Sequence, residues 1–216
     1  MNLPEDFHLL VVDDSSPDGT ASIVEGICNE FPEKLFLLLR KEKDGLGRAY
    51  IAGFKWALKK QYDYIFEMDA DFSHNPDDLS KLSNALDEGA DLSIGSRYVT
   101  GVNVVNWPMG RVLLSYIASK YVRFITGMVV RDTTAGFVGY KRSILESINL
   151  DKIRFKGYAF QIEMKYKAWK KSFVIKEVPI IFTDRSEGES KMSKGILREA
   201  LLGVIELRVA SMLGRL

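Results

Sequence analysis

The stretch YIFEMDADFSH, residues 64–74, decides the fold that we expect for this chain. Its mostly apolar beginning has the composition of a buried strand, and two carboxylates, Asp69 and Asp71, follow where that strand ends. An unpaired carboxylate beside a core is costly, and a hard ion such as Mg²⁺ or Mn²⁺ takes oxygen ligands and bridges them to substrate phosphates. The pair indicates a phosphate-bearing substrate, although a solvated acidic turn explains an Asp-x-Asp taken alone more simply.

The rest of the chain repeats this pattern of apolar runs between helical segments, which predicts an α/β fold with a mostly parallel sheet flanked by helices. The predicted strands are residues 8–12, 35–39, 62–68, 91–94, 137–140 and 173–182. The predicted helices are residues 18–31, 45–60, 76–88, 109–126, 158–171 and 196–213. Pro179 lies inside the last predicted strand and indicates an edge or a bulge.

Length and composition fit one domain. The chain has 216 residues, of which 46% are hydrophobic and 27% are charged, and this balance supports one substantial core. The formal net charge is +1, so no overall field attracts nucleic acid, and we expect no nucleic-acid partner.

Polar clusters follow three of the predicted strands directly. They are Asp13-Asp14, Asp69-Ala70-Asp71 and Ser96-Arg97. Ligands of open α/β sheets bind in the crevice beyond the carboxyl ends of the strands. We therefore expect a binding site where these clusters meet.

Two further motifs each have two explanations. The segment DDSSPDGT, residues 13–20, offers short acidic and hydroxyl side chains that can accept hydrogen bonds from ribose or a base, but Ser16 or Asp18 can equally cap the following helix. The segment GLGRA, residues 45–49, lets the backbone approach an anion at a helix N-terminus, and as a lone glycine pair it is a weak signal.

Basic side chains on or after this rim are candidates for binding phosphates, and the planar fork of arginine suits that task. They are Arg97, Arg111 and Arg123, followed by Arg185 and Lys191 on either side of residues 186–190. Because scattered arginines are usually solvated, we expect Arg123 to lie in solvent. We expect His74 to hydrogen-bond within its loop rather than to bind a metal.

Taken together, these segments resemble the dolichol-phosphate (polyprenol-phosphate) mannose synthases, members of glycosyltransferase family 2 with the GT-A fold. The matches run in order from about residue 9 to residue 191, and such an ordered set is far more specific than one acidic pair. They are VVDDSSPDGT (11–20), GLGxA (45–49), MDADFSH (68–74), GSRY (95–98), Trp107 with Arg111, DTTAGF (132–137), GYAFQxE (157–163), EVPI (177–180), Asp184-Arg185 and GESK (188–191).

The resemblance implies inverting transfer of mannose from GDP-mannose to a polyprenyl phosphate such as dolichyl phosphate, with Mg²⁺ or Mn²⁺ as cofactor. By this resemblance the metal ligands are Asp69, Asp71 and Ser73, the last standing where some relatives have a glutamine. The nucleotide-sugar site comprises Asp13, Asp14, Asp18, Gly47, Asp69, Ala70, Gln161 and Glu163. The lipid-phosphate site comprises Arg97, Arg111, Arg185 and Lys191, and the catalytic residues are Asp71, Arg97 and Arg111.

This reaction agrees with the absence of a candidate catalytic histidine. An alcohol acceptor needs a base to remove its proton, whereas a phosphate monoester is largely ionised near neutral pH. Positioning and charge neutralisation can then carry the reaction.

We expect a peripheral protein at the cytoplasmic face of a membrane. No window reaches the roughly 18 uninterrupted apolar residues of a membrane span, and residues 1–6 do not resemble a signal peptide. We assign residues 1–194 to the GT-A domain and residues 195–216 to an amphipathic helix. That helix either packs on the domain, lies on the bilayer or contacts a membrane-anchoring partner subunit.

One departure from the family concerns the N-terminus. The family has a strand and a Pro-x-Tyr-Asn-Glu motif ahead of the Asp-Asp strand, whereas Met1 lies only a few residues before His8. We expect the first βα unit to be missing, which favours a poorly stable or inactive chain. Two alternatives therefore remain: a sibling enzyme that uses another sugar nucleotide such as UDP-glucose, and a non-catalytic remnant that binds nucleotide or a partner.

Overall fold

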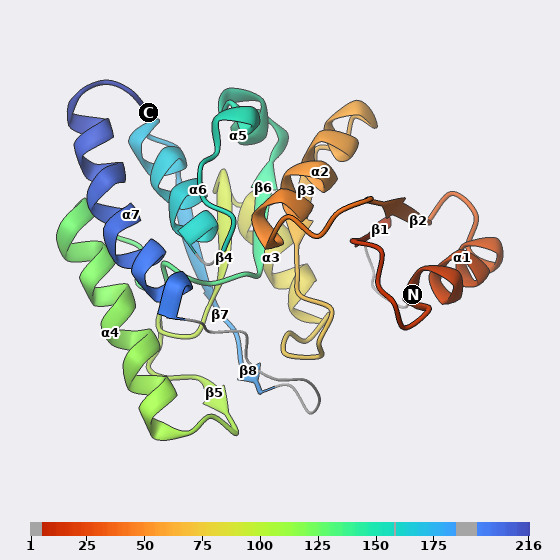
Figure 1. Cartoon of the computed structure of the whole chain (residues 1–216), viewed down its shortest axis with the longest axis horizontal. Helices are drawn as coiled ribbons and strands as arrows, with labels where there is room; N and C mark the ends of the chain where they lie inside the picture. The colour runs from red at the N-terminus through yellow and green to blue at the C-terminus, as the bar shows by residue number, and fades with distance from the viewer. Residues whose placement is uncertain (1–5, 158, 185–193) are drawn as a thin grey trace.

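A computed structural model describes residues 6–157, 159–184 and 194–216 and has an α/β architecture (Figure 1). The strands are β1 (Leu9–Asp13), β2 (Leu35–Leu39), β3 (Tyr64–Glu67), β4 (Leu92–Ser96), β5 (Val104–Val105), β6 (Val138–Lys141), β7 (Ile175–Pro179) and β8 (Phe182–Thr183). The helices are α1 (Thr20–Glu30), α2 (Leu46–Lys59), α3 (Asp78–Asp87), α4 (Met109–Thr126), α5 (Arg142–Ser147), α6 (Ala159–Lys170) and α7 (Lys194–Met212), with a 3₁₀ turn at Leu150–Lys152.

The main sheet has the strand order β3-β6-β4-β7. Strand β7 runs parallel to β4, whereas β6 runs antiparallel to both of its neighbours, an arrangement that the sequence pattern did not predict. Gly139 in β6 is required by packing, because a side-chain carbon there would lie 2.5 Å from the Phe66 ring and 2.6 Å from Ser93 Oγ. The α/β fold class predicted from the sequence is confirmed.

The predicted strand at residues 173–182 is divided into two. Strand β7 ends at Pro179, and β8 pairs with β5 in a separate two-stranded sheet. Strand β7 lies at the edge of the main sheet, as the proline indicated, because proline has no N–H to donate to a further strand.

Strands β1 and β2 form a parallel pair of their own. Among the described residues this pair shares no backbone ladder with the main sheet. The two sheets meet through side chains: the Phe7 and Phe66 rings lie 5.7 Å apart, and His8 Nδ1 lies 2.8 Å from the Tyr62 hydroxyl.

The main sheet is covered on both faces. A large cluster of buried apolar side chains lies against α2, α4, α6 and α7, and a smaller one lies against α3. Phe137 belongs to the smaller cluster and its neighbour Val138 to the larger, as the alternation of side chains along a strand requires. Helix α7 packs against α4 and α6 and buries Val204 and Leu207 (Figure 1). Within the described part of the chain, no helix is both long and apolar enough to cross a membrane.

Candidate active site

The acidic pair follows β3 and is held by hydrogen bonds from neighbouring side chains. Tyr50 on α2 donates to Asp69 Oδ1 over 2.7 Å, and Ser73 donates to Asp71 Oδ1 through its backbone N–H and its hydroxyl, over 3.1 and 2.5 Å. Burial and the charge of Asp69 raise the pKa of Tyr50 well above 10, so its hydroxyl keeps its proton and remains a donor. Both carboxylates therefore have fixed orientations.

The donor set of this pair suits a hard divalent cation. Mg²⁺ is commonly bound by one or two carboxylates together with substrate phosphates and water. Among the described residues no group of three or more His, Cys, Asp and Glu could hold a metal. Ser73 uses its hydroxyl proton to orient Asp71, and its role as a third ligand stays a prediction.

His74 links the acidic pair to the cationic part of the site. Its ring is buried between Phe137 and Phe182, with centroids 5.1 and 5.2 Å away, and its Nδ1 has no hydrogen-bond partner among the described residues. The ring is thus held by packing rather than by the loop hydrogen bond that we expected. Burial lowers the pKa of His74, while Asp69 and Asp71 raise it and Arg97 lowers it. These electrostatic effects indicate that the acidic pair and the guanidinium surround one histidine.

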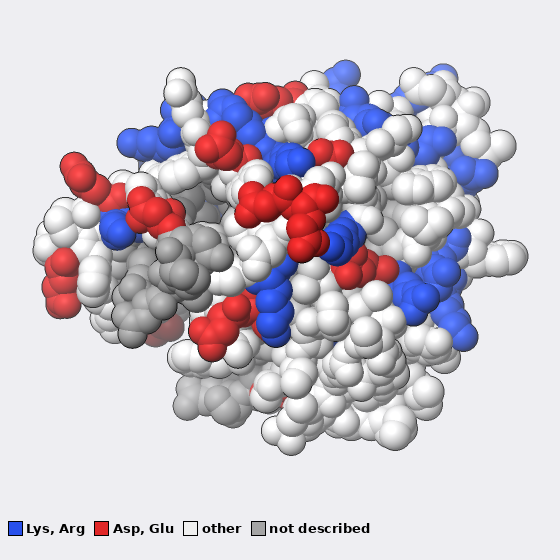
Figure 2. All heavy atoms as spheres, turned by 180° about the vertical axis from the view of Figure 1, so that it is seen from behind, with Lys and Arg blue, Asp and Glu red and all other residues white. Residues whose placement is uncertain are grey.

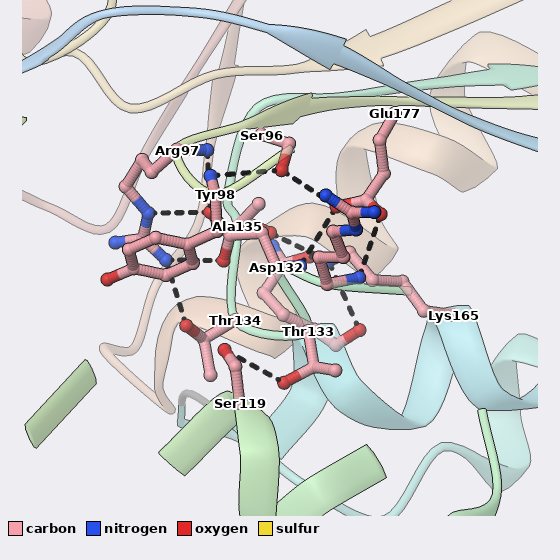
Figure 3. A network of polar contacts seen from close by, with 12 residues as sticks. Ser96, Arg97, Tyr98, Ser119, Asp132, Thr133, Thr134, Ala135, Lys165 and Glu177 are labelled. Carbon is pink, nitrogen blue, oxygen red and sulfur yellow. Dashed lines mark hydrogen bonds and ion pairs between the residues drawn. The ribbon is translucent and has the colours of Figure 1, made fainter. Parts of the chain in front are cut away.

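Arg97, which follows β4, is bound by a fully buried carboxylate (Figure 3). Its backbone N–H and Nε donate to Asp132 Oδ2 over 2.9 and 2.7 Å, and its Nη2 donates to Asp132 Oδ1 over 2.6 Å. Nη2 also donates to the Thr134 hydroxyl over 2.9 Å. Burial raises the pKa of Asp132, but the adjacent guanidinium outweighs this and holds the pKa below its usual value. No described residue accepts a hydrogen bond from Nη1, so this atom is left for a ligand.

The loop that carries Asp132 is anchored from two elements (Figure 3). Glu177 on β7 accepts from the Ser96 hydroxyl over 2.7 Å and from the Asp132 backbone N–H over 2.9 Å. Lys165 on α6 donates to the Ala135 carbonyl over 2.7 Å. The same loop runs beside the acidic pair, since a side-chain carbon at Gly136 would lie 3.5 Å from Asp69 Oδ2.

Lys165 is fully buried and near a second buried ionisable group. Burial lowers the pKa of Lys165 to about 8 and raises the pKa of Glu67 to about 8, and each charge partly offsets the other. Glu67 accepts from the Tyr140 hydroxyl over 2.9 Å. The sequence analysis assigned no role to Lys165 or Glu67.

Aromatic rings and a second arginine complete the cationic side. The guanidinium of Arg97 lies 5.5 Å from the Trp107 ring, and that of Arg111 on α4 lies 4.2 Å from the same ring. Arg111 Nη1 forms an ion pair with Asp184 Oδ1 over 2.8 Å. Trp107 contacts Phe182, with ring centroids 5.2 Å apart. The two arginines expected to bind one phosphate therefore share one tryptophan, while Arg185 and Lys191 lie outside the described residues.

The acidic residues after β1 are already paired within the protein. Asp13 is buried and accepts from the Ser16 backbone N–H over 3.0 Å. Asp14 forms an ion pair with Arg40 over 2.8 Å, a partner that the sequence analysis overlooked. Asp18 accepts from the backbone N–H and hydroxyl of Thr20, the first residue of α1, but the N-cap of that helix is Gly19, without a side-chain cap hydrogen bond, so neither Ser16 nor Asp18 is the N-cap that we expected. Nucleotide binding by these three residues stays a prediction.

The other residues assigned to the nucleotide sugar differ in exposure. Ala70 is exposed, whereas Gln161 and Glu163 on α6 are buried. Glu163 accepts from the backbone N–H groups of Arg154 and Phe155 and pairs with Lys167, so it supports a loop, and nucleotide-sugar binding by Gln161 and Glu163 stays a prediction.

Gly47 is packed against that same loop. A side-chain carbon at Gly47 would lie 2.8 Å from the Phe160 ring and 2.9 Å from the Phe155 carbonyl oxygen. Its close neighbour on the side-chain side is thus the protein itself, and nucleotide-sugar binding by Gly47 stays a prediction.

A GT-A-type sheet with an acidic pair after β3, the buried Arg97 after β4 and the partly exposed Arg111 on α4 has the arrangement of a glycosyltransferase. The family model described as glycosyl transferase family 2 matches residues 2–148, and the chain belongs to this family.

Two curated relatives cover nearly the whole chain. Polyprenol monophosphomannose synthase from Mycolicibacterium smegmatis is 47% identical over 96% of this chain and 78% of its own length. Undecaprenyl-phosphate mannosyltransferase from Micrococcus luteus is 46% identical over 94% of this chain and 83% of its own length. Among solved structures, glucosyl-3-phosphoglycerate synthase from Mycobacterium tuberculosis, in complex with Mn²⁺, UDP and glucosyl-3-phosphoglycerate, aligns with a TM-score of 0.59. It is 18% identical over 96% of this chain and 68% of that chain, a similarity of fold alone.

Proposed function

We propose that this protein transfers mannose from GDP-mannose to the phosphate of a polyprenyl lipid, with inversion at the sugar carbon and dependence on a divalent metal. The observation that carries the proposal is that one loop joins the two halves of the site: Asp132 accepts from the buried Arg97 guanidinium over 2.7 and 2.6 Å, and a side-chain carbon at Gly136 would lie 3.5 Å from Asp69 Oδ2. Such a site can bind two anionic reactants at once. The names of the two relatives, a polyprenol monophosphomannose synthase and an undecaprenyl-phosphate mannosyltransferase, support the same reaction.

On the donor side, the oriented carboxylates are the functional groups. Asp69 and Asp71 would hold Mg²⁺ or Mn²⁺, and that ion would supply positive charge to offset the charge of the GDP leaving group. Tyr50 and Ser73 keep the carboxylates in one orientation, which lowers the cost of organising the site when the donor binds.

On the acceptor side, the guanidinium groups of Arg97 and Arg111 bind the lipid phosphate. Asp132 fixes the plane of the Arg97 guanidinium and leaves Nη1 for the phosphate, while Trp107 packs against both arginines. Since the phosphate is largely ionised near neutral pH, its oxygen attacks the sugar without a general base. The proposed work of the arginines is to place that oxygen and to offset its charge.

A donor panel tests this function. Purified protein with Mn²⁺ and a short polyprenyl phosphate should transfer mannose from GDP-mannose, and a chelator should stop the transfer. Transfer from UDP-glucose but not from GDP-mannose would replace mannose with glucose in the proposal. Calorimetry with GDP and Mn²⁺ separates a non-catalytic remnant from an enzyme, because a well-folded protein that shows no metal-dependent binding of GDP would be a remnant.

The substitution Asp71→Asn tests the metal site itself. It keeps the size of the side chain and removes one charge, so kcat should fall at least about a hundred-fold, with the urea midpoint of unfolding unchanged. Unchanged turnover would remove Asp71 from the metal site.

A further inference from the structure

Helix α4 exposes a row of large apolar side chains to solvent. Met109 is 71% exposed, Leu113 51%, Ile117 58% and Phe124 86%, although all four are apolar. Positions spaced by three or four residues lie on one side of a helix, so these residues form one stripe along α4. The opposite side of the helix buries Ser119, Val122 and Thr126 in the protein.

The charges on α4 are all positive. Its sequence contains Arg111, Lys120 and Arg123 and no Asp or Glu. Lys120 lies within the apolar stripe by its spacing and Arg123 at its margin, and both are exposed. In Figure 2, a broad surface without charged residues spreads over the lower right, where the turn from Figure 1 brings the lower part of α4 and β5. An apolar helix face with cations and no acidic residue is complementary to an anionic lipid surface.

The stripe also lies close to the cationic side of the site. Met109 is two residues before Arg111, whose guanidinium packs on Trp107. Helix diameters are about 10–12 Å, so a bilayer resting on the stripe lies about one helix width from the Arg111 backbone. A lipid phosphate at the bilayer surface is then within reach of the arginines.

Helix α7 has exposed apolar residues as well, but its charges are not all positive and it does not lie beside the predicted acceptor site. Its sequence includes two glutamates, and Glu206 pairs with Arg154. Its buried side, with Val204 and Leu207, contributes to the large core cluster instead of to the predicted acceptor site. The structure therefore favours α4 over the C-terminal helix as the surface that contacts lipid.

We propose that the stripe on α4, formed by Met109, Leu113, Ile117 and Phe124 with Lys120 and Arg123, is the surface that binds an anionic lipid bilayer. This inference rests on the proposed function, in which the acceptor is embedded in a membrane. Apolar side chains enter the headgroup region, and the cations attract the anionic lipids, so binding weakens as the salt concentration rises.

Vesicle flotation of the full chain with a matched pair of double variants tests the proposal. Leu113→Glu with Ile117→Glu places two acidic residues in the α4 stripe. Ile205→Glu with Val209→Glu makes the same change at the same spacing on α7, at positions that are 44% and 49% exposed. The vesicles are pure phosphatidylcholine or an equimolar mixture of phosphatidylcholine and phosphatidylglycerol. A third variant, Leu113→Ser with Ile117→Ser, removes the apolar groups without adding charge.

The unmodified chain and the α7 variant should float with the anionic vesicles, and both should bind the neutral vesicles less. The α4 glutamate variant should lose roughly ten-fold or more of this binding, and the serine variant should lose a smaller share. Equal flotation of the α4 variants and the unmodified chain would overturn the proposal, as would loss in the α7 variant alone. If the unmodified chain is a dimer that the α4 variants convert to a monomer without change in flotation, the stripe binds a second copy and the proposal is wrong.

A detergent assay separates this proposal from the proposed function. With a short polyprenyl phosphate and no vesicles, the α4 glutamate variant should keep the transfer rate of the unmodified chain, because neither position touches the predicted site. If the unmodified chain transfers no mannose in this assay yet floats through α4, the proposed function fails and the lipid surface stands. If transfer occurs and flotation does not depend on α4, the lipid surface fails alone.

Discussion

Strand β1 has a single buried residue, Asp13, whereas all five residues of β4 are buried. Helix α1, which packs on β2, has no buried residue and leaves Ile23 and Ile27 exposed. Helix α6, in contrast, is buried along residues 159–168. The sheet that carries the predicted acceptor residues is thus deeply buried, and the unit β1-α1-β2, which carries Asp13 and Asp14, is much less so.

This difference has a functional consequence. Local opening costs least where few apolar contacts hold a segment, and ligand binding stabilises the segment that it contacts. We expect the buried sheet to keep the predicted acceptor site formed at all times, while the unit β1-α1-β2 gains stability when nucleotide binds.

The largest expected difference between the two regions comes from their ion pairs. Asp132→Ala should lower the free energy of unfolding by about 3–5 kcal/mol, because it leaves the Arg97 guanidinium buried without its partner. Asp14→Ala removes a pair whose side chains are both partly exposed and should cost about 1 kcal/mol or less. Urea unfolding of both variants measures the two losses of unfolding free energy. Equal losses would show that the buried and the partly exposed ion pair stabilise the protein equally.

A pair of leucine substitutions sharpens the comparison through packing alone. Leu92 on β4 is fully buried, so Leu92→Ala should cost about 2–5 kcal/mol. Leu37 on β2 is only half-buried, and Leu37→Ala should cost less than half as much, because fewer contacts are lost and no closed cavity forms. A larger loss for Leu37→Ala than for Leu92→Ala would show that the β1-β2 pair is the better supported region.

Buried ionisable groups in the main sheet and on α6 should make the free energy of unfolding depend on pH, whereas the unit β1-α1-β2 should contribute no such dependence. Burial lowers the pKa of Lys165 from its ordinary 10.5 to about 8. Between these values the unfolded chain binds a proton that the folded chain has released, so the contribution of Lys165 to the free energy of unfolding rises with pH, by on the order of 3 kcal/mol. Glu67 acts in the opposite sense at lower pH, because its raised pKa makes stability fall as pH rises from 4.5 to about 8.

Urea unfolding between pH 8 and 10.5 measures the Lys165 effect. Lys165→Met should remove the rise and leave a flatter profile, whereas Lys34→Met, a substitution in the unit β1-α1-β2, should keep the slope of the unmodified chain. Parallel profiles for Lys165→Met and the unmodified chain would contradict this assignment.

The smallest expected effect is on hydrogen exchange. Amides of β1 and β2 should exchange faster than those of β4, by roughly ten-fold or more, and GDP with Mn²⁺ should slow β1 and β2 more than β4. If the amides of β1, β2 and β4 exchange at the same rate, both with and without GDP, the two regions open together.

Local sequence patterns predicted much of this architecture. The bounds of β2 and of α4 agree with prediction to the residue, because each has a periodicity and a boundary signal within its own segment. The antiparallel direction of β6 and the division of residues 173–182 into two strands were not predicted, because strand direction and pairing depend on residues distant in the sequence.

The candidate site was predicted in the same uneven way. The positions of Asp69, Asp71, Arg97 and Arg111 followed from their places after strands and from the family resemblance. The pairing of Arg97 with Asp132 spans 35 residues, and the contact of Lys165 with Ala135 spans 30, so no local pattern contains either. The partners of Glu163 were likewise not predicted, because membership of a matching motif does not reveal that its carboxylate binds the backbone of residues 154–155 and pairs with Lys167.

The most direct measurement compares two acceptors that differ only in the phosphate. With GDP-mannose and Mn²⁺, this protein is offered a short polyprenyl phosphate or the corresponding polyprenol at the same concentration. If paired arginines place an already ionised phosphate oxygen against the sugar, mannose is transferred to the phosphate and not measurably to the alcohol. Transfer to the polyprenol at a comparable rate would contradict this, because an alcohol acceptor requires a base that the proposed mechanism does not contain.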